Sequence, residues 1–305
     1  MYLIFSLAIF ISLTLELDAQ TSRSSTDFND RGFQRFSKGD YDGAIADFTE
    51  VIDLSSRLGP TKRKTGSSSG AGENDRGNIR VLDPQTYNGY LARGLAYFAK
   101  ADFDRALADY DRAIDTLPGR PNAYVSRGNV YLLKRDLEKA LTDYEKALRT
   151  DPRFAAAYIG RGMALMDRGE LTAAMADFDH AVELAPKDAL AYNYRGDALR
   201  RIGELDRALA DFNAAIQLDG RLANAFEGRG IVWVRKGDLA RGIDDLTTAI
   251  KIQPQLATAY VDRGAVYYAS GRFDDAQRDF DQALALAPHL KAEIDANIAA
   301  IKRLH

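Results

Sequence analysis

The chain has 305 residues, of which 46% are hydrophobic and 28% are charged, proportions that are ordinary for a folded protein. Its formal net charge is −3, so it lacks the broad positive field that attracts nucleic acid, and we expect no nucleic-acid partner. It contains no cysteine, which excludes disulfides, thiolate catalysis and zinc–thiolate sites.

The first segment is an apolar run from Tyr2 to Leu15. It is shorter than the roughly 20 residues that a membrane-spanning helix needs, and its length is typical of the apolar core of a signal peptide. Ala19 supplies a small residue before a cleavage site, although no Lys or Arg precedes the run and Leu17 is not small. We interpret residues 1–19 as a signal peptide or, if uncut, as an N-terminal membrane anchor.

This leader decides the expected compartment. An exported chain would be periplasmic or secreted, and it would associate with the membrane through residues 1–19 if the anchor is kept. The exported part has no Asn-x-Ser/Thr acceptor, which favours a bacterial envelope over a eukaryotic secretory route. If the leader has no targeting role, the protein is cytoplasmic.

Seven Arg-Gly pairs organise the rest of the chain, because sixteen residues after each Arg there is an Asp. The matched residues are Arg31 with Asp47, Arg93 with Asp109, Arg127 with Asp143, Arg161 with Asp177, Arg195 with Asp211, Arg229 with Asp245, and Arg263 with Asp279. The last six copies are 34 residues apart, and the first lies 62 residues before the second, which is one period plus 28 residues. A fixed period of this length indicates a repeat array.

We therefore expect a first repeat at residues 25–58, an insertion at 59–86 and six contiguous repeats at 87–288. The insertion contains a basic cluster, Thr61 to Thr65, followed by a Gly/Ser-rich stretch. Such a composition cannot bury enough apolar area to fold, so we predict a disordered loop. It is either a tolerated surface insertion or a basic tether for an anionic lipid, a cell-wall polymer or an acidic partner.

Residues 121–154 illustrate one repeat. Small and aromatic residues recur at helical spacing on both sides of the polar turn at residues 134–136, and Pro152 ends the repeat. Each repeat is thus predicted to be two antiparallel helices joined by a short turn. We expect Gly128 on the first helix and Ala140 on the second to let the two helix backbones approach closely.

The turn inside each repeat also has a recognisable residue. Five repeats place a glycine where the first helix should end in a left-handed conformation. These glycines are Gly39, Gly169, Gly203, Gly237 and Gly271. Ala101 and Arg135 replace the glycine in the other two repeats, and they carry backbone strain if the turn geometry is kept there.

These repeats resemble the tetratricopeptide repeat, whose 34-residue pattern has an aromatic, then Leu-Gly, Tyr, Ala, Phe and Pro. One matching copy contains Tyr260, Gly264, Tyr267, Ala276, Phe280, Ala283 and Pro288. The departure is an Arg before each Gly, where the common pattern has Leu. The resemblance implies an all-α fold, a right-handed superhelical solenoid of antiparallel helix pairs with an inner groove lined by the first helix of each pair.

The Arg at the unusual position and its Asp form a set that we call the Arg–Asp ladder. An unpaired charge in a mostly apolar helix interface is costly, so their joint presence predicts salt bridges within a repeat or between neighbours. The alternative is that the seven arginines line the groove and bind an anionic ligand.

The last segment, residues 289–305, has Leu290, Ile294, Ile298 and Ile301 at helical spacing. We predict a C-terminal capping helix, because the end of a solenoid needs a polar outer face. A partner-binding tail is the alternative.

No reaction chemistry is indicated by the sequence. The three histidines have no metal-ligand spacing, and the Gly-rich stretch lacks the lysine and strand of a phosphate-binding loop. The carboxylates largely follow the repeat period, which favours a structural role. We therefore expect a protein that is not an enzyme, with no catalytic residues, no cofactor and no metal.

By the resemblance, positions two, five, nine, twelve and thirteen of each repeat line the inner groove. They give Asn88, Leu91, Leu95, Phe98, Asn122, Val125, Asn129, Leu132, Ile159, Met163, Met166, Asn193, Asp197, Arg200, Arg201, Glu227, Ile231, Val234, Arg235, Val261 and Tyr268. The early part is apolar with asparagines, and the later part carries arginines. A clamp for a C-terminal carboxylate is unsupported, since Val125 stands where a lysine is needed.

We therefore expect a scaffold or adaptor that binds a protein or peptide partner in this groove, in a bacterial cell envelope. Two alternatives remain open. One is a cytoplasmic adaptor of the same fold, and the other is an accessory factor for the assembly of envelope or secreted proteins.

Overall fold

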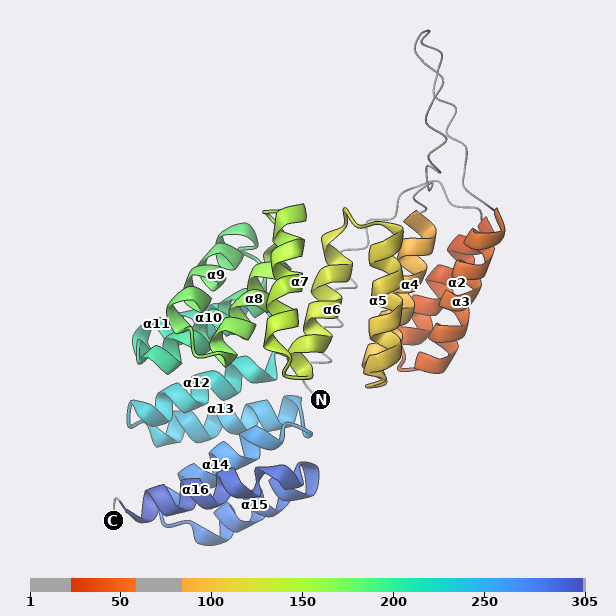
Figure 1. Ribbon diagram of the computed structural model, residues 1–305. Coiled ribbons are helices and arrows are strands. Elements are labelled where there is room, and N and C mark those ends of the chain that lie inside the picture. The colour runs from red at the N-terminus through yellow and green to blue at the C-terminus, as the bar shows by residue number, and fades with distance from the viewer. Residues whose placement is uncertain (1–22, 59–83, 304–305) are drawn as a thin grey trace. The chain divides into compact units, whose positions relative to one another are not determined.

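The computed structural model describes residues 23–58 and 84–303, in which all regular secondary structure is helical (Figure 1). The leader and most of the predicted insertion lie outside these residues. None of the described helices is both long and apolar enough to cross a membrane. The chain divides into two compact units, Met1–Ala164 and Leu165–His305.

The helices form seven consecutive pairs, as the 34-residue period predicts. The pairs are α2 (Arg23–Ser37) with α3 (Tyr41–Leu58), α4 (Pro84–Ala99) with α5 (Phe103–Thr116), α6 (Pro121–Leu133) with α7 (Leu137–Thr150), α8 (Ala155–Asp167) with α9 (Leu171–Leu184), α10 (Ala189–Ile202) with α11 (Leu205–Leu218), α12 (Ala223–Arg235) with α13 (Leu239–Ile252), and α14 (Ala257–Ala269) with α15 (Phe273–Leu286). A short 3-10 helix, η1 (Pro288–Leu290), leads into α16 (Lys291–Lys302). Because α4 begins at Pro84, the last residues assigned to the insertion are helical.

A buried ring fills the space between the two helices of most repeats. In the third repeat the ring is Tyr144, which is fully buried. A Cβ added to Gly128 would lie 2.9 Å from this ring, and one added to Gly160 on α8 would lie closer still. The atoms nearest to Gly128 thus belong to the Tyr144 ring. The small residue makes room for a ring, whose burial contributes roughly 1.5–3 kcal/mol.

The turn between the two helices of a repeat keeps one geometry. Its five glycines have φ between +75° and +98°, the left-handed region. Ala101 and Arg135 adopt the same conformation with φ of 59° and 62°. The turn therefore imposes its backbone conformation even where the sequence supplies a side chain.

The Arg–Asp ladder connects the two helices within a repeat. In five repeats the Arg Nε and Nη2 donate to the two oxygens of the Asp over 2.7–2.8 Å, and Arg31 binds Asp47 through the same nitrogens. The five pairs are Arg93 with Asp109, Arg127 with Asp143, Arg195 with Asp211, Arg229 with Asp245, and Arg263 with Asp279. The aspartates of all six pairs are buried, and the guanidinium fork matches the carboxylate with two parallel hydrogen bonds.

The third guanidinium nitrogen connects neighbouring repeats. Arg127 Nη1 donates to Asp111 over 2.5 Å, and Arg195 Nη1 donates to Asp179 over 3.0 Å. These acceptors lie two residues after the Asp position of the preceding repeat. Each Arg also lies over the aromatic ring three residues earlier, for instance Tyr124 at 6.0 Å from the Arg127 guanidinium. Because these nitrogens are bound within the protein, the geometry does not favour the alternative in which the ladder arginines bind an anionic ligand.

The first helices of the repeats form the tighter layer of each unit. In the second unit α10 contacts α12, α12 contacts α14, and α14 contacts α16, whereas the described second helices make no comparably close contact with one another. Helices on the concave side of a curved stack approach each other more closely than those on the convex side. The first helices therefore form the concave side of the second unit, and we call this surface its inner face.

Candidate functional site

The predicted groove residues differ strongly in their accessibility. Those of the early repeats are mostly buried within the helix layers, namely Leu91, Leu95, Phe98, Val125, Asn129, Leu132, Ile159, Met163 and Met166. Asn129 is also engaged inside the protein, since its Oδ1 accepts a 2.7 Å hydrogen bond from the Tyr144 hydroxyl. Asn88 and Asn122 are the partly exposed members of the first unit. The early groove therefore contributes packing more than recognition.

The second unit exposes more of the predicted set. Asn193 and Val261 are buried there. Six others are half-buried, namely Asp197, Arg200, Glu227, Ile231, Val234 and Tyr268, and Arg201 and Arg235 are exposed. The polar residues accessible to a partner are thus concentrated on α10 and α12. This concentration makes the inner face of the second unit the candidate site.

On α10 one carboxylate holds two arginines. Asp197 Oδ1 accepts from Arg200 Nε over 3.0 Å, and its Oδ2 accepts from Arg201 Nε over 3.0 Å. The spacing of three and four residues places these side chains on one side of the helix. Arg235 on α12 donates from Nη1 to the Arg200 carbonyl over 2.9 Å, which connects the two helices. Two of the three predicted groove arginines therefore share one carboxylate within the protein.

Glu227 on α12 and Asp262 on α14 are the carboxyl groups of the site whose charge is least neutralised by neighbouring cations. Burial raises the pKa of Glu227 to about 7, and it does so against a hydrogen bond from Thr258 that lowers it. Burial also raises the pKa of Asp262 to about 8, and the neighbouring charge of Glu227 raises it further. Arg200 lowers both pKa values, and Glu293 on α16 raises both. The two carboxyl groups are consequently protonated through much of the neutral range.

We call Asp197, Glu227, Asp262 and Glu293 the acidic cluster. They come from four first-layer helices, α10, α12, α14 and α16, which contact one another in that order. Electrostatic interactions couple Glu227 to the three other members. The repeat fold thus gathers on one face four carboxylates that lie far apart in sequence.

The positional rule for the groove missed Asp262 and Glu293. It selected Val261 in the seventh repeat, which is buried. Asp262 directly precedes the ladder Arg263, a place held in the other contiguous repeats by Ala92, Ser126, Gly160, Tyr194 and Gly228. Asp262 is the one charged residue at this position among the six contiguous repeats, although Asp30 holds it in the first repeat, and this was the available signal. Glu293 lies in the segment predicted to be a polar cap and is exposed there, and the contact of α16 with α14 brings it into electrostatic range of Glu227 and Asp262.

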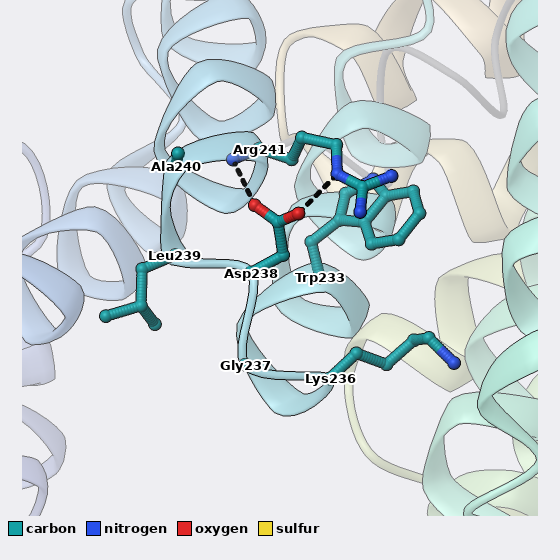
Figure 2. A pocket seen from close by; sticks show the side chains of 7 residues that line it. All are labelled: Trp233, Lys236, Gly237, Asp238, Leu239, Ala240 and Arg241. Carbon is teal, nitrogen blue, oxygen red and sulfur yellow. Dashed lines mark hydrogen bonds and ion pairs between the residues drawn. The ribbon is translucent and has the colours of Figure 1, made fainter.

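A surface depression of about 540 Å³ lies at the turn between α12 and α13, and no member of the acidic cluster lines it (Figure 2). Its polar groups are engaged with one another. Arg241 stacks on Trp233 with its guanidinium 3.6 Å from the ring centroid, and its Nε donates to Asp238 over 2.6 Å. Lys236 is paired with Asp206 at 2.6 Å. These pairs stabilise the turn, and they leave little uncompensated polarity for a ligand.

Among the described residues, no group of three His, Asp or Glu side chains is arranged to hold a metal ion. His180 is exposed beside Glu183, and its Nδ1 lies 3.6 Å from that carboxylate.

Comparisons with known proteins agree with this architecture. A tetratricopeptide repeat model matches residues 91–153, 134–189, 160–223 and 194–257, and a second model of the same repeat matches residues 257–290. No curated protein sequence matches the chain significantly.

Several solved structures are similar. A tetratricopeptide repeat protein from Parabacteroides merdae ATCC 43184 has a TM-score of 0.63 and 21% identity, covering 92% of this chain and 100% of that one. The APC/C hetero-tetramer Cut9-Hcn1 has a TM-score of 0.65 and 15% identity, covering 97% of this chain and 59% of that one. YrrB, a TPR protein with an unusual peptide-binding site, is 30% identical with a TM-score of 0.42, covering 56% of this chain and 88% of that one. Since matches to one repeat model extend over residues 91–257, more than half of its length, this chain belongs to the tetratricopeptide repeat family.

Proposed function

We propose that this protein is a non-catalytic scaffold that binds a peptide segment of a partner protein on the inner face of its second unit, in a bacterial cell envelope. The family consists of protein-interaction scaffolds, which supports the general function. The choice of face rests on the structure of this chain.

One observation carries the choice of face. The residues that recur from repeat to repeat are used inside the scaffold, because the ladder arginines bind aspartates and, in most repeats, a buried ring occupies the space beside a glycine. Residues that do not repeat, including Asp197, Glu227 and Arg235, gather on the inner face of the second unit. Recognition of a particular partner requires residues that the scaffold does not need for folding.

Site-specific photo-crosslinking tests this proposal. A photoreactive phenylalanine analogue is placed at Ile231 or Tyr268 on the inner face, and the matched controls carry it at the exposed Ala240 on α13 or Gln277 on α15. We expect the inner-face positions to crosslink to one partner protein in native cells and the outer positions not to do so. Equal crosslinking from both sets, or none from the inner face, would contradict the proposed face.

The envelope location is supported by the apolar leader alone. Its test is the intact mass of the native protein together with its distribution among periplasmic, membrane and cytoplasmic fractions. A mass lacking residues 1–19 and recovery outside the cytoplasm are expected. An uncut chain in the cytoplasmic fraction would instead support the cytoplasmic adaptor.

A further inference from the structure

Three members of the acidic cluster, Glu227, Asp262 and Glu293, make no ion pair with any described residue. The fourth, Asp197, is already bound by Arg200 and Arg201. Within the described part of the chain, Arg200 is the one cation that interacts electrostatically with both Glu227 and Asp262, and its guanidinium points to Asp197. The face therefore has more carboxylates than cations to neutralise them.

Glu227 and Asp262 belong to one site. The Thr258 side chain of α14 interacts with Glu227 of α12 and lowers its pKa, and the two helices contact each other. Each carboxyl group interacts with the other, with Arg200 of α10 and with Glu293 of α16. Each of the helices α10, α12, α14 and α16 thus contributes a charged group to this site.

Two buried hydrogen-bond acceptors on this face have no partner among the residues that the structure describes. They are Oε1 of Glu227 and Oδ1 of Asn193, whose residue is 7% exposed. Asn193 lies 34 residues before Glu227 and so holds the same place in its repeat, one turn before Asp197 on α10. A buried acceptor without a donor is unfavourable, and a donor brought by a ligand removes that cost.

We propose that the partner segment is basic and that one of its lysine or arginine side chains lies between Glu227 and Asp262, with Asn193 as a further acceptor. This inference rests on the proposed function, because it specifies the partner bound on the same face. An ammonium group has three donors and a guanidinium has five, so either can serve several acceptors that the protein leaves free. The excess of carboxylates favours such a cation over an acidic or purely apolar segment.

Binding of a cation to this site should release protons. Glu227 and Asp262 bind protons more tightly than exposed carboxyl groups do, because they are largely buried and close to each other and to Asp197 and Glu293. A bound lysine or arginine favours their ionised forms. The affinity of a basic peptide therefore increases with pH while the peptide keeps its charge, by up to tenfold per pH unit for each proton released.

A selection from a random heptapeptide library on the full-length protein tests the inference. The library is selected at about pH 8.5, and the enriched peptides are titrated at that pH and at about pH 6, below both raised pKa values. Fluorescence of Trp233, the single tryptophan of the chain, reports binding near α12. The double variant Glu227→Gln and Asp262→Asn is compared with Asp274→Asn, which removes an exposed carboxylate from α15.

We expect enrichment of Lys and Arg, at least tenfold weaker binding at the lower pH, and a comparable loss in the double variant but not in Asp274→Asn. Peptides that bind equally well to the double variant, or that are acidic or apolar, would overturn the inference and leave the proposed function standing. If no peptide is enriched at all, the proposed function falls and the inference falls with it.

Discussion

Arg135 is held in a left-handed conformation that disfavours any residue with a Cβ. The Asp136 amide that follows it donates to the Tyr131 carbonyl over 2.9 Å, which closes the end of α6. The repeated turn thus fixes the backbone, and the side chain is tolerated at a cost. Ala101 has the same role at the end of α4.

Replacing Arg135 with glycine should therefore stabilise the protein. Glycine adopts this conformation without the steric cost, so we expect about 1 kcal/mol of added stability, reduced by the greater freedom of glycine in the unfolded chain. The measurement is the urea midpoint followed by circular dichroism. Gly169→Ala, at the matching position of α8, is the control and should shift the midpoint in the opposite direction. A lower midpoint for Arg135→Gly would show that the turn is not strained.

At the scale of helices, the ladder both closes a repeat and connects it to its neighbour. The buried Asp143 on α7 binds Arg127 on α6, and the same guanidinium reaches Asp111 on α5. These two contacts differ in exposure, since the side chain of Asp143 is 3% exposed and that of Asp111 is 55% exposed. The intra-repeat contact should therefore contribute more to stability than the inter-repeat one.

A double-mutant cycle measures this difference. Arg127→Leu leaves Asp143 buried without its cation, which should cost about 3–5 kcal/mol. Arg127→Leu combined with Asp143→Leu should cost at least about 1 kcal/mol less than the sum of the two single changes. Asp111→Asn is the exposed control and should cost no more than about 1 kcal/mol. Additive effects at Arg127 and Asp143 in urea unfolding would mean that the salt bridge contributes no net coupling.

At the scale of the whole molecule, the 34-residue period predicted the helix pairs, whereas the individual repeat positions predicted the groove less well. A 34-residue spacing is enough to give helix pairs, because each copy must bury the same small and aromatic residues against its neighbour. The joint occurrence of Arg and Asp indicated a pair, and the structure gives its geometry in six repeats.

The exposed fraction of each groove residue was not predictable from the repeat period. Leu95 and Glu227 both came from the positional rule, yet Leu95 is buried and Glu227 is half-buried. Exposure depends on the size of the neighbouring side chains and on how closely successive first helices approach, and neither quantity is periodic. Asp262 was missed for a related reason. A fixed set of repeat positions takes no account of where the cap helix α16 packs.

The buried carboxyl groups make the stability of the second unit depend on pH. The folded-state pKa values of Glu227 and Asp262, about 7 and about 8, lie above their unfolded values of about 4. Between about pH 4 and pH 8 the folded state therefore binds more protons than the unfolded state, so stability falls as the pH rises. Below this window both states are protonated, and above it both are ionised, so these two groups add no further slope. Asp188, whose pKa burial raises to about 6, acts in the same direction.

The double variant Glu227→Gln and Asp262→Asn isolates this contribution, because neutral amides cannot titrate. Its melting temperature, followed by Trp233 fluorescence, should exceed that of the parent by a margin that grows from pH 5 to about pH 8 and then stays constant. Asp274→Asn should follow the parent at every pH, since that carboxylate is exposed. A basic peptide selected on the parent should reduce this margin at high pH, because a bound cation compensates the charges that destabilise the ionised pair. If the difference in melting temperature between the double variant and the parent is constant from pH 5 to about pH 8, the two carboxyl groups titrate like exposed ones. The proton release expected on peptide binding would then also be absent.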